Sequence, residues 1–543
     1  MTAWSVAVVP RPLSVTDLHA GGAVLADGLG LAHAPELAPE ARWFRGALEA
    51  GAGWAVSAAC AGEPDAAVIE LRLGDLEELP ADLRALMPAA TRHEGYRLTS
   101  SGGRVVITGR SRAGVFYGLQ TLRQLLPDSL LRQAGQSGPI QLPALEIVDA
   151  PRFTWRGVHI DVSRHFLPKS FILKLIDLIA LHKCNVLHLH LTDDQGWRIP
   201  IARYPLLTEV GAWRGPSADG HGEGAVDAFP HGGFFSREDL AEIVAFAATR
   251  HVNVLPEIDM PGHMVAAIAA YPELGNTARR LQVRPDWGIS AHVLNLDDST
   301  LRFCTEVIDE VTDIFPWRYV HLGGDECPVT EWQSSPRAQQ LMRQNGYTDE
   351  RKLQGWFTAR MAEHLAARGR SLVGWSEIIE GGAPADAVVM AWRGEEDGVK
   401  AVAAGHDVVM AAQEWLYFDR PYVRDPAEPA GFPGATSVEK VYRYDPVPAA
   451  VPAADRDHVL GAQCELWTEF VTTPGHAEYL YFPRLCAFAE AVWTTETTTQ
   501  PKAFEEFVAR LARHLRRLAA LGVNYRPLEG PTPGQARVWT QPK

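Results

Sequence analysis

From Trp155 onward, short apolar runs alternate with amphipathic stretches of helical length, and this alternation restricts the possible folds more than any other feature of the sequence. Eight runs have the length and apolar content of buried strands. They are Gly157–Val162, Asn185–Leu191, Asn253–Ile258, Tyr319–Leu322, Ser371–Gly374, Ala387–Ala391, Asp407–Met410 and Val459–Gln463. Helical stretches separate or follow most of them, at Lys169–His182, Ser236–Arg250, Ser299–Ile314, Lys352–Arg368 and Ala477–Val492. Eight strands that mostly alternate with helices predict a (β/α)8 barrel in which some helices are short or replaced.

The first part of the chain follows a different pattern. Two strand-like segments flank Ser100–Gly103 and predict a hairpin, and Ser111–Leu126 has the apolar spacing of a helix. Residues 1–150 are therefore expected to form a smaller α+β domain. The barrel is expected to span residues 151–522, which include a last amphipathic helix, and residues 523–543 are expected to form a loose C-terminal tail.

Composition argues against several classes of partner. The formal net charge is −15 and no basic block offsets it, so neither nucleic acid nor an anionic membrane is expected as a partner. No apolar run of about 18 residues occurs, and Met1–Pro10 lacks the basic start and the apolar core of a signal peptide. We therefore expect a cytoplasmic protein. The six cysteines are scattered without a CxxC pair, which indicates neither a zinc knuckle nor a disulfide framework.

The segment Val320–Glu326 carries the strongest chemical signal. An apolar strand runs into Gly323 and Gly324 and then into two adjacent carboxylates, Asp325 and Glu326. Such a pair is costly in a core but can present a proton donor and an anion to a substrate. Active sites of (β/α)8 barrels lie at the C-terminal ends of the strands, and polar and aromatic residues gather there in this sequence. These residues are Ser163–His165, Thr192–Asp194, Glu257–His263, Asp325, Glu326, Trp375, Trp392, Tyr417, Asp419, Trp467 and Glu469.

At these residues the chain resembles the family 20 glycoside hydrolases, the β-N-acetylhexosaminidases. Six separated motifs occur in the order of that family: Asp161–Phe166, His190–Arg198, Pro256–His263, His321–Glu326, Gly374–Glu377 and Leu466–Glu469. The preceding residues resemble the accessory α+β domain of the family. The resemblance implies a retaining enzyme that removes terminal, non-reducing GlcNAc or GalNAc from β-linked oligosaccharides or glycoconjugates. It also implies substrate assistance, in which the 2-acetamido oxygen of the sugar is the nucleophile and an oxazolinium intermediate forms.

The resemblance further implies a role for each matched side chain. Glu326 would be the general acid and then the general base, and Asp325 would orient and stabilise the 2-acetamido group. Asp193 and His263 match the pair that supports the general acid. The remaining matches would bind the sugar: Tyr417 at the acetamido oxygen, Arg164 at O3 and O4, Glu469 and Asp419 at O4 and O6, and Trp375, Trp392 and Trp467 as pocket walls. No cofactor or metal is implied.

Two other functions are alternatives to this interpretation. A metal-dependent amidohydrolase on the same barrel would use ligands from His188, His190, His263, His321 and Asp325. A non-catalytic sugar-binding protein would keep the tryptophans and Arg164 without needing Glu326. The chain also departs from relatives that carry one more tryptophan, because none occurs between Leu416 and Leu466, where Phe432 is the candidate replacement. The sequence leaves the aglycone preference and the oligomeric state open.

Overall fold

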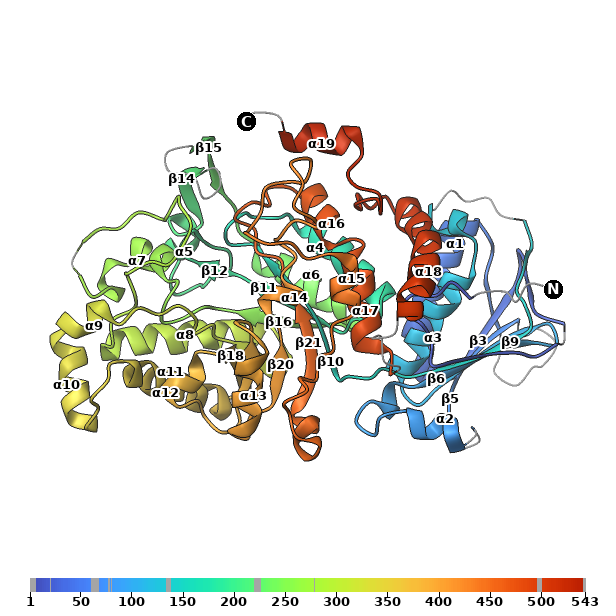
Figure 1. Ribbon diagram of the computed structural model, residues 1–543, viewed down its shortest axis with the longest axis horizontal. Coiled ribbons are helices and arrows are strands. Elements are labelled where there is room, and N and C mark those ends of the chain that lie inside the picture. Colours follow the sequence, from blue (N-terminus) through green and yellow to red (C-terminus); the bar gives the residue numbers. More distant parts are fainter. Residues whose placement is uncertain are drawn as a thin grey trace.

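The computed structural model describes residues 6–19, 21–59, 68–76, 79, 81–132, 138–218, 226–277, 279–495 and 501–540. In this part of the chain, a domain built on a seven-stranded mixed sheet precedes a closed, eight-stranded parallel barrel (Figure 1). The predicted α+β domain and the predicted (β/α)8 barrel are both confirmed. Cys60 lies outside the described residues, and the other five cysteines are free thiols. No helix in the described ranges is both long and apolar enough to span a membrane.

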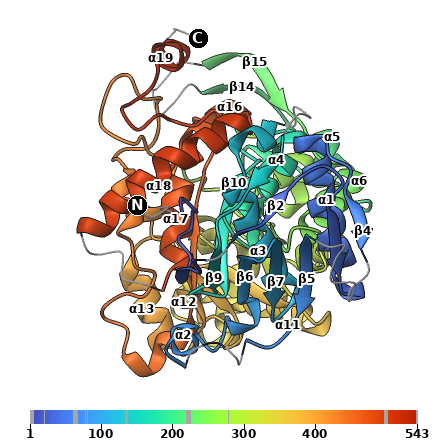
Figure 2. The same ribbon diagram turned by 90° about the vertical axis from the view of Figure 1, so that its right-hand side faces the viewer.

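The sheet of the N-terminal domain has the strand order β1-β9-β6-β7-β5-β3-β4. β6 and β7 form the predicted hairpin, and in Figure 2 they lie side by side between β9 and β5. Helix α3 (Arg112–Leu125) packs on this hairpin and begins after Ser111, whose hydroxyl accepts a hydrogen bond from the Gly114 N–H at 3.2 Å. The other elements are β1 (Ser14–Asp17), β2 (Val24–Leu25), β3 (Gly30–His33), α1 (Ala38–Ala52), β4 (Ser57–Ala59), β5 (Ile69–Leu73), α2 (Ala81–Leu86), β6 (Tyr96–Ser101), β7 (Arg104–Gly109), β8 (Ile140–Gln141) and β9 (Leu145–Asp149).

The barrel closes in the order β10-β11-β16-β17-β18-β19-β20-β21, and each pair of neighbouring strands is parallel. Every predicted strand overlaps one of these eight. Their bounds are β10 (Trp155–Asp161), β11 (Val186–His190), β16 (Asn253–Glu257), β17 (Tyr319–His321), β18 (Ser371–Trp375), β19 (Val388–Ala391), β20 (Val408–Met410) and β21 (Val459–Cys464).

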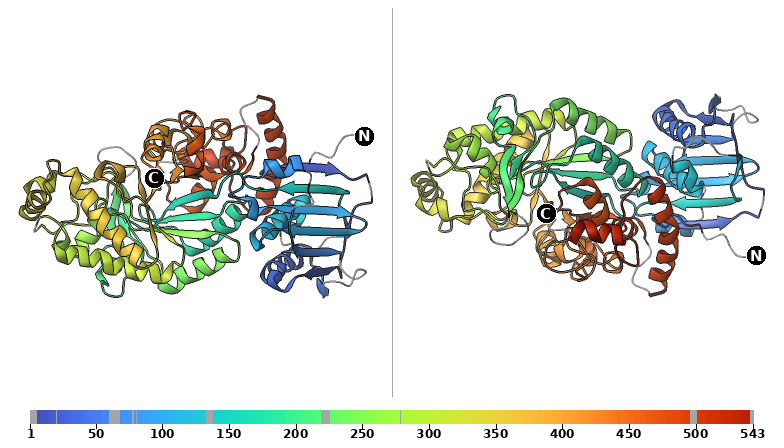
Figure 3. Two further views of the ribbon diagram at one scale, coloured as in Figure 1. Left: turned by 90° about the horizontal axis from the view of Figure 1, so that it is seen from below. Right: turned by 90° about the horizontal axis from the view of Figure 1, so that it is seen from above.

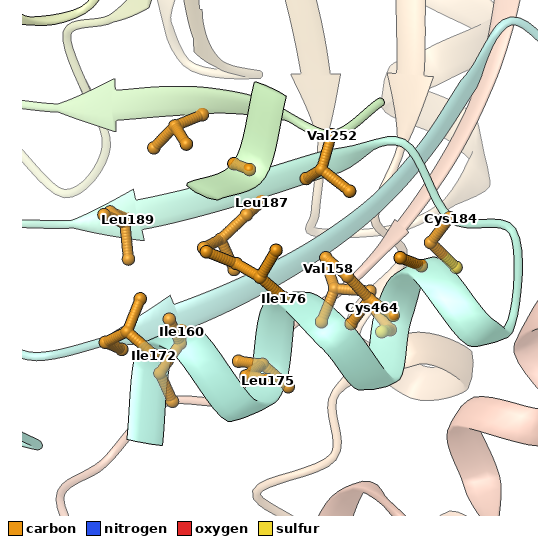
Figure 4. Close-up of a cluster of buried hydrophobic side chains, with 14 of the residues drawn as sticks. Val158, Ile160, Ile172, Leu175, Ile176, Cys184, Leu187, Leu189, Val252 and Cys464 are labelled. Carbon is orange, nitrogen blue, oxygen red and sulfur yellow. The ribbon is translucent and has the colours of Figure 1, made fainter. Parts of the chain in front are cut away.

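Side chains alternate along β11 between a helix on one side and the barrel interior on the other. Leu187 and Leu189 point toward helix α4 (Lys169–Leu181), where Ile172 and Ile176 pack against them (Figure 4). Complete burial of one such aliphatic side chain contributes about 1.5–3 kcal/mol. His188 and His190 occupy the alternate positions, so both face the interior of the barrel. The strand therefore brings polar groups beneath the C-terminal mouth of the barrel.

Helices surround the barrel, and further elements lie in the loops that connect its strands. The helices are α4, α6 (Arg237–Ala248), α8 (Asp298–Ile314), α11 (Arg351–Ala367), α13 (Glu395–Ala403) and α17 (Arg484–Trp493), and α18 (Pro501–Ala520) follows them in the chain. The loop elements are β12 (Thr192–Asp193), β13 (Gly196–Trp197), α5 (Leu206–Glu209), β14 (Trp213–Ala218), β15 (Val226–Gly232), α7 (Val265–Ala270), α9 (Thr330–Ser334), α10 (Pro336–Asn345), α12 (Ile378–Gly381), α14 (Gln413–Leu416) and α15 (Val438–Tyr442). The short α12, α14 and α15 occupy places where full barrel helices are replaced.

The C-terminal part differs from the prediction in two places. The single helix expected at Ala477–Val492 is two helices, α16 (Pro474–Tyr481) and α17, because Pro483 lacks the N–H that would continue the first one. The expected loose tail is also structured: α19 spans Pro533–Thr540, and buried Arg526 forms an ion pair with Glu428 at 2.7 Å. The segment after α18 therefore packs onto the barrel.

Two buried cations of the barrel reach into the N-terminal domain. The Lys183 amine lies 2.8 Å from Asp149 Oδ2 and donates to the Tyr96 hydroxyl at 2.9 Å. The Arg156 guanidinium lies 2.6 Å from Glu94 Oε2, and both cations are completely buried. Helix α18 runs beside the same junction in both views of Figure 3. The two domains therefore share a charged interface as well as an apolar one.

Lys183→Met should lower the free energy of unfolding by about 3–5 kcal/mol, because Asp149 would be left buried without its cation. The control is Arg72→Met, which removes an exposed partner of Glu70 and should cost less than about 1 kcal/mol. Urea denaturation of both variants checks this expectation. Equal losses in the two variants would show that the buried pair contributes no more than a surface pair.

Candidate active site

Each predicted site residue lies at or just beyond the C-terminal end of a barrel strand. Because the strands are parallel and the barrel is closed, all of these ends meet at one mouth. Arg164 follows β10, Asp193 follows β11, His263 follows β16, Asp325 and Glu326 follow β17, Trp375 ends β18, Trp392 follows β19, Tyr417 and Asp419 follow β20, and Trp467 and Glu469 follow β21. The contacts below connect these side chains into one site.

The turn after β17 depends on two glycines in left-handed conformations. Gly323 has φ of +63° and Gly324 has φ of +93°. The Gly324 N–H donates to Asp259 Oδ1 at 3.1 Å, and a Cβ atom on Gly323 would lie only 1.7 Å from that same oxygen. Glycine is therefore required at Gly323 both for its backbone conformation and for the close approach of Asp259.

Both carboxylates beyond the glycines face one imidazole nitrogen. His263 Nε2 lies 3.6 Å from Asp325 Oδ2 and 3.6 Å from Glu326 Oε2. Glu326 has φ of +45°, a conformation that costs a non-glycine residue about 1–2 kcal/mol. Glu326 is 32% exposed and Asp325 is 14% exposed, so Glu326 lies nearer to solvent.

His263 is held from its other side by Asp193, with Nδ1 3.2 Å from Asp193 Oδ1. Burial by itself would lower the pKa of His263, but Asp193 and Glu326 together raise it well above its ordinary value. Burial would raise the pKa of Asp193, yet Arg164 and His263 hold it well below its ordinary value. The arrangement therefore favours an imidazolium on His263 and a carboxylate on Asp193.

A second imidazole extends this chain of contacts into the barrel. His190 Nε2 lies 2.9 Å from Asp193 Oδ2, and its Nδ1 lies 2.5 Å from Glu257 Oε2. Glu257 Oε1 also accepts a hydrogen bond from the Trp375 indole at 2.8 Å. Buried acids and imidazoles therefore alternate from Glu257 to Glu326.

Arg164 connects three acids on the opposite side of the site. Its guanidinium lies 2.9 Å from Asp193, 3.2 Å from Asp161 and 4.0 Å from Glu469. It also lies 5.0 Å from the centre of the Trp467 ring. Arg164 is 9% exposed, so this is a buried network and not a surface salt bridge.

Aromatic rings form the remaining side of the site. The Tyr417 ring stacks on the Trp392 ring with 6.2 Å between the ring centres, and its centre lies 6.3 Å from that of Trp467. Trp375 lies 5.8 Å from Trp467 but is only 1% exposed, and its indole is directed to Glu257. Trp375 therefore lies deeper than the expected wall position, while Trp392 and Trp467 are partly exposed.

Four carboxylate oxygens in the site have no hydrogen-bond partner among the residues that the structure describes: Asp259 Oδ2, Asp325 Oδ1, Asp419 Oδ1 and Glu469 Oε2. Burial raises the pKa of Asp325, although His263 opposes this shift. Burial also raises the pKa of Glu469 to about 7, although Arg164 opposes that shift. Burial, with Glu469 nearby, raises the pKa of Asp419 well above its ordinary value. Buried acceptors of this kind need donors, and the hydroxyl and amide groups of a ligand can supply them.

The family resemblance implies no individual role for several residues of the site. Glu257, Asp259 and Glu377 lie inside the matched motifs, and the first two also belong to the polar segment predicted at the end of a strand. Glu377 accepts from the Trp392 indole at 2.9 Å, and burial raises its pKa to about 7. Gln195 accepts from the Arg164 guanidinium at 3.0 Å. The motifs indicate that these residues lie near the site. Their hydrogen-bond partners depend on the three-dimensional arrangement and could not be predicted from the motifs.

The ligands of the metal-dependent alternative do not converge on one point. His188 and His321 lie 3.0 and 2.9 Å from Glu257 inside the barrel. His263 instead contacts Asp193 and Asp325 at the mouth. Possible ligand atoms lie within 4.8 Å of one another in separate sets at the two levels: His188, Glu257 and His321 form one, and Asp193, Asp259 and His263 form another. This division disfavours an amidohydrolase centre.

Comparison with known proteins gives consistent matches over both domains. Residues 153–496 match the family model described as "Glycosyl hydrolase family 20, catalytic domain", and residues 5–150 match "Glycosyl hydrolase family 20, domain 2". The beta-hexosaminidase of Porphyromonas gingivalis is 40% identical over 521 residues, which are 95% of this chain and 64% of that protein. This chain thus spans less than two thirds of that relative.

Other relatives match over most of their length. The beta-N-acetylhexosaminidase of Cellulomonas fimi is 34% identical over 94% of this chain and 93% of that protein. Among solved structures, the exo-β-N-acetylglucosaminidase of Vibrio harveyi in complex with N-acetylglucosamine has a TM-score of 0.82. It is 31% identical, and the match covers 96% of this chain and 78% of that one.

Gly323→Ala should destabilise the protein more than the same change at Gly346. Both glycines have left-handed backbones, with φ of +63° and +66°, so alanine should cost about 1–2 kcal/mol of backbone strain at either position. At Gly346 a Cβ atom would meet nothing within 4 Å, whereas at Gly323 it would overlap Asp259. The overlap should add about 1–3 kcal/mol, measured as free energy of unfolding. Equal losses at the two positions would contradict the close approach of Asp259.

Proposed function

The chain belongs to glycosyl hydrolase family 20, and from that premise we propose that it is a β-N-acetylhexosaminidase. In this proposal it removes terminal β-linked GlcNAc or GalNAc from oligosaccharides or glycoconjugates. The observation that carries the proposal is the pair Asp325 and Glu326 around His263 Nε2, at a barrel mouth that also holds partly exposed tryptophans and unpaired acceptors. This set of groups suits a neutral, hydroxylated ligand with one amide group. The proposed substrate is therefore a small carbohydrate.

Glu326 is the proposed proton donor to the leaving group. It is the more exposed of the two carboxylates, as a group that contacts the departing sugar must be. When Glu326 releases its proton, the neighbouring His263 imidazolium stabilises the new carboxylate. In the second step Glu326 takes a proton from water, and the hydroxide portion attacks the anomeric carbon. Asp193 keeps His263 charged and oriented in both steps.

The proposed nucleophile belongs to the substrate. The 2-acetamido oxygen attacks the anomeric carbon while the glycosidic bond breaks, and a positively charged oxazolinium ring forms. Asp325 would accept a hydrogen bond from the acetamido N–H through its unpaired Oδ1 and stabilise the positive charge. Tyr417 would donate its hydroxyl to the acetamido oxygen, because burial raises its pKa well above 10 and keeps it protonated. No covalent bond to the protein is formed.

The remaining side chains would bind the sugar. Arg164 is fixed by three acids and presents its guanidinium beside Trp467, which suits the O3 and O4 hydroxyls. Asp419 and Glu469 each have an unpaired oxygen that can accept from O4 or O6. Trp392 and Trp467 would flank the ring and the acetamido group, with Trp375 beneath them.

Phe432 is the proposed replacement for the tryptophan that is missing between Leu416 and Leu466. Its N–H donates to the Asp419 carbonyl at 3.3 Å, and its ring lies edge-on to Phe470 at 5.5 Å. Phe470 directly follows Glu469, so this aromatic pair lies beside both proposed hydroxyl acceptors. We propose that it borders the position of the leaving sugar.

A panel of aryl β-glycosides tests the activity. The 2-acetamido substrates should be hydrolysed at least roughly 10³-fold faster than the matching glucoside, because an intramolecular nucleophile has a large entropic advantage. Steady-state kcat/KM values for compounds that differ only at C2 provide the measurement. Comparable rates for the acetamido and hydroxyl compounds would refute substrate assistance. Binding without turnover of any member would indicate a sugar-binding protein instead.

Variants at the two carboxylates test the roles. Glu326→Gln should lower kcat by about 10²–10⁴ for poor leaving groups and by less for activated aryl groups, which need little protonation. Asp325→Asn should also lower kcat, because charge stabilisation at the acetamido nitrogen is lost. Asp298→Asn on α8, whose side chain is 80% exposed, is the control and should leave kcat unchanged. A Glu326→Gln enzyme with equal losses for all leaving groups would not fit a general acid.

A further inference from the structure

A cavity of about 740 Å³ lies at the mouth of the barrel opposite Asp325 and Glu326. Trp155, Asn253 and Tyr319, which begin strands β10, β16 and β17, line it from the barrel side. His93 and Tyr117 line it from the N-terminal domain. Tyr319 is the first residue of β17, whereas Asp325 and Glu326 follow the last residue of that strand. The cavity and the candidate active site therefore lie at opposite ends of β17. Its volume is within the range of small-ligand sites, about 300–1,000 Å³.

Three aromatic rings form one corner of the cavity. The ring centre of Trp317 lies 5.1 Å from that of Trp155 and 5.0 Å from that of Tyr319, and the latter two lie 5.6 Å apart, so all three rings contact one another. Trp155 is buried, but Trp317 and Tyr319 are both partly exposed. Trp317 belongs to the short loop between α8 and β17, which does not pair in the barrel. An indole at this position therefore offers a face to the cavity in addition to its packing contacts.

Exposed polar side chains border the aromatic corner. Asn253 and Arg318 both line the cavity and are exposed, so their amide and guanidinium groups can reach a ligand. Arg318 lies over the Tyr319 ring at 4.6 Å. His93 is also exposed, with Nε2 3.9 Å from Glu94 Oε1. Glu94 itself is paired with Arg156.

We propose that this cavity is a second carbohydrate-binding site, which holds one or two sugar rings without cleaving them. Aromatic faces pack against the C–H faces of a pyranose, and amide, imidazole and guanidinium groups at the edge can bond its hydroxyls. Arg318 is the only Lys or Arg among the described lining residues, and Glu94 is already paired with Arg156, so the lining favours a neutral ligand over a multiply charged anion. Glu94 is the only carboxylate among the described residues that line the cavity, so a pair like that at the other mouth is not formed there, and binding and not hydrolysis is expected. The choice of β-linked N-acetylhexosamine as the sugar rests on the proposed function.

Calorimetric titration of the Glu326→Gln protein with a β-linked GlcNAc trisaccharide tests the proposal, because hydrolysis is suppressed in that variant. Two classes of binding site are expected. Adding Trp317→Ala should weaken one class at least about tenfold, whereas Trp317→Phe should retain most of it because a ring remains. In the otherwise unchanged enzyme, Trp317→Ala should leave kcat/KM for a small aryl substrate unchanged, which also verifies folding.

The outcomes separate the second site from the proposed activity. A single class of sites that Trp317→Ala does not change would overturn the second site and leave the proposed function intact. A single class that Trp317→Ala removes would support the second site and count against sugar binding at the catalytic mouth. Equal effects of the alanine and phenylalanine changes would also overturn an aromatic platform at Trp317.

Discussion

One guanidinium balances the acidic side of the site. Arg164 contacts Asp161, Asp193 and Glu469 at distances of 2.9 to 4.0 Å, within a region that is almost entirely buried. Burial raises the pKa of Asp193, and Arg164 is the strongest of the groups that oppose this effect. Charged Asp193 in turn raises the pKa of His263, so loss of Arg164 would weaken the support for an imidazolium beside Glu326. The proton chemistry proposed for one side of the site thus depends on an arginine on the other.

The interior of the barrel provides a rigid floor for that site. Glu257 contacts the rings of His188, His190 and His321 and fixes the Trp375 indole. Burial would raise the pKa of Glu257, but the imidazoles hold it well below its ordinary value, so a buried carboxylate stays charged. A buried network of charges and hydrogen bonds stabilises the fold most when every polar group in it has a partner. The polar core therefore specifies the position of Trp375 more sharply than apolar packing would.

The sequence predicted the positions of the barrel strands and the end of the barrel that carries the site, because both follow from local pattern and parallel topology. It did not predict the depth of Trp375 or the partners of Glu257. Those depend on which strands are neighbours and on their register, as in the pairing of His190 with Glu257. The helix break at Pro483 was visible in the sequence but was outweighed by the apolar spacing around it. The positive φ of Glu326 also left no signal in the sequence, because it is imposed by the turn.

The charged interface between the domains limits how this fold can be divided. Arg156 and Lys183 belong to the barrel, but their counter-ions, Glu94 and Asp149, belong to the preceding domain. A barrel separated from that domain would expose two cations and a large apolar face, and the separated domain would retain two acids that lack partners. The N-terminal domain therefore contributes to the stability of the barrel and is not an independent module. Exchange of such domains between related proteins would require both halves of each ion pair to be transferred together.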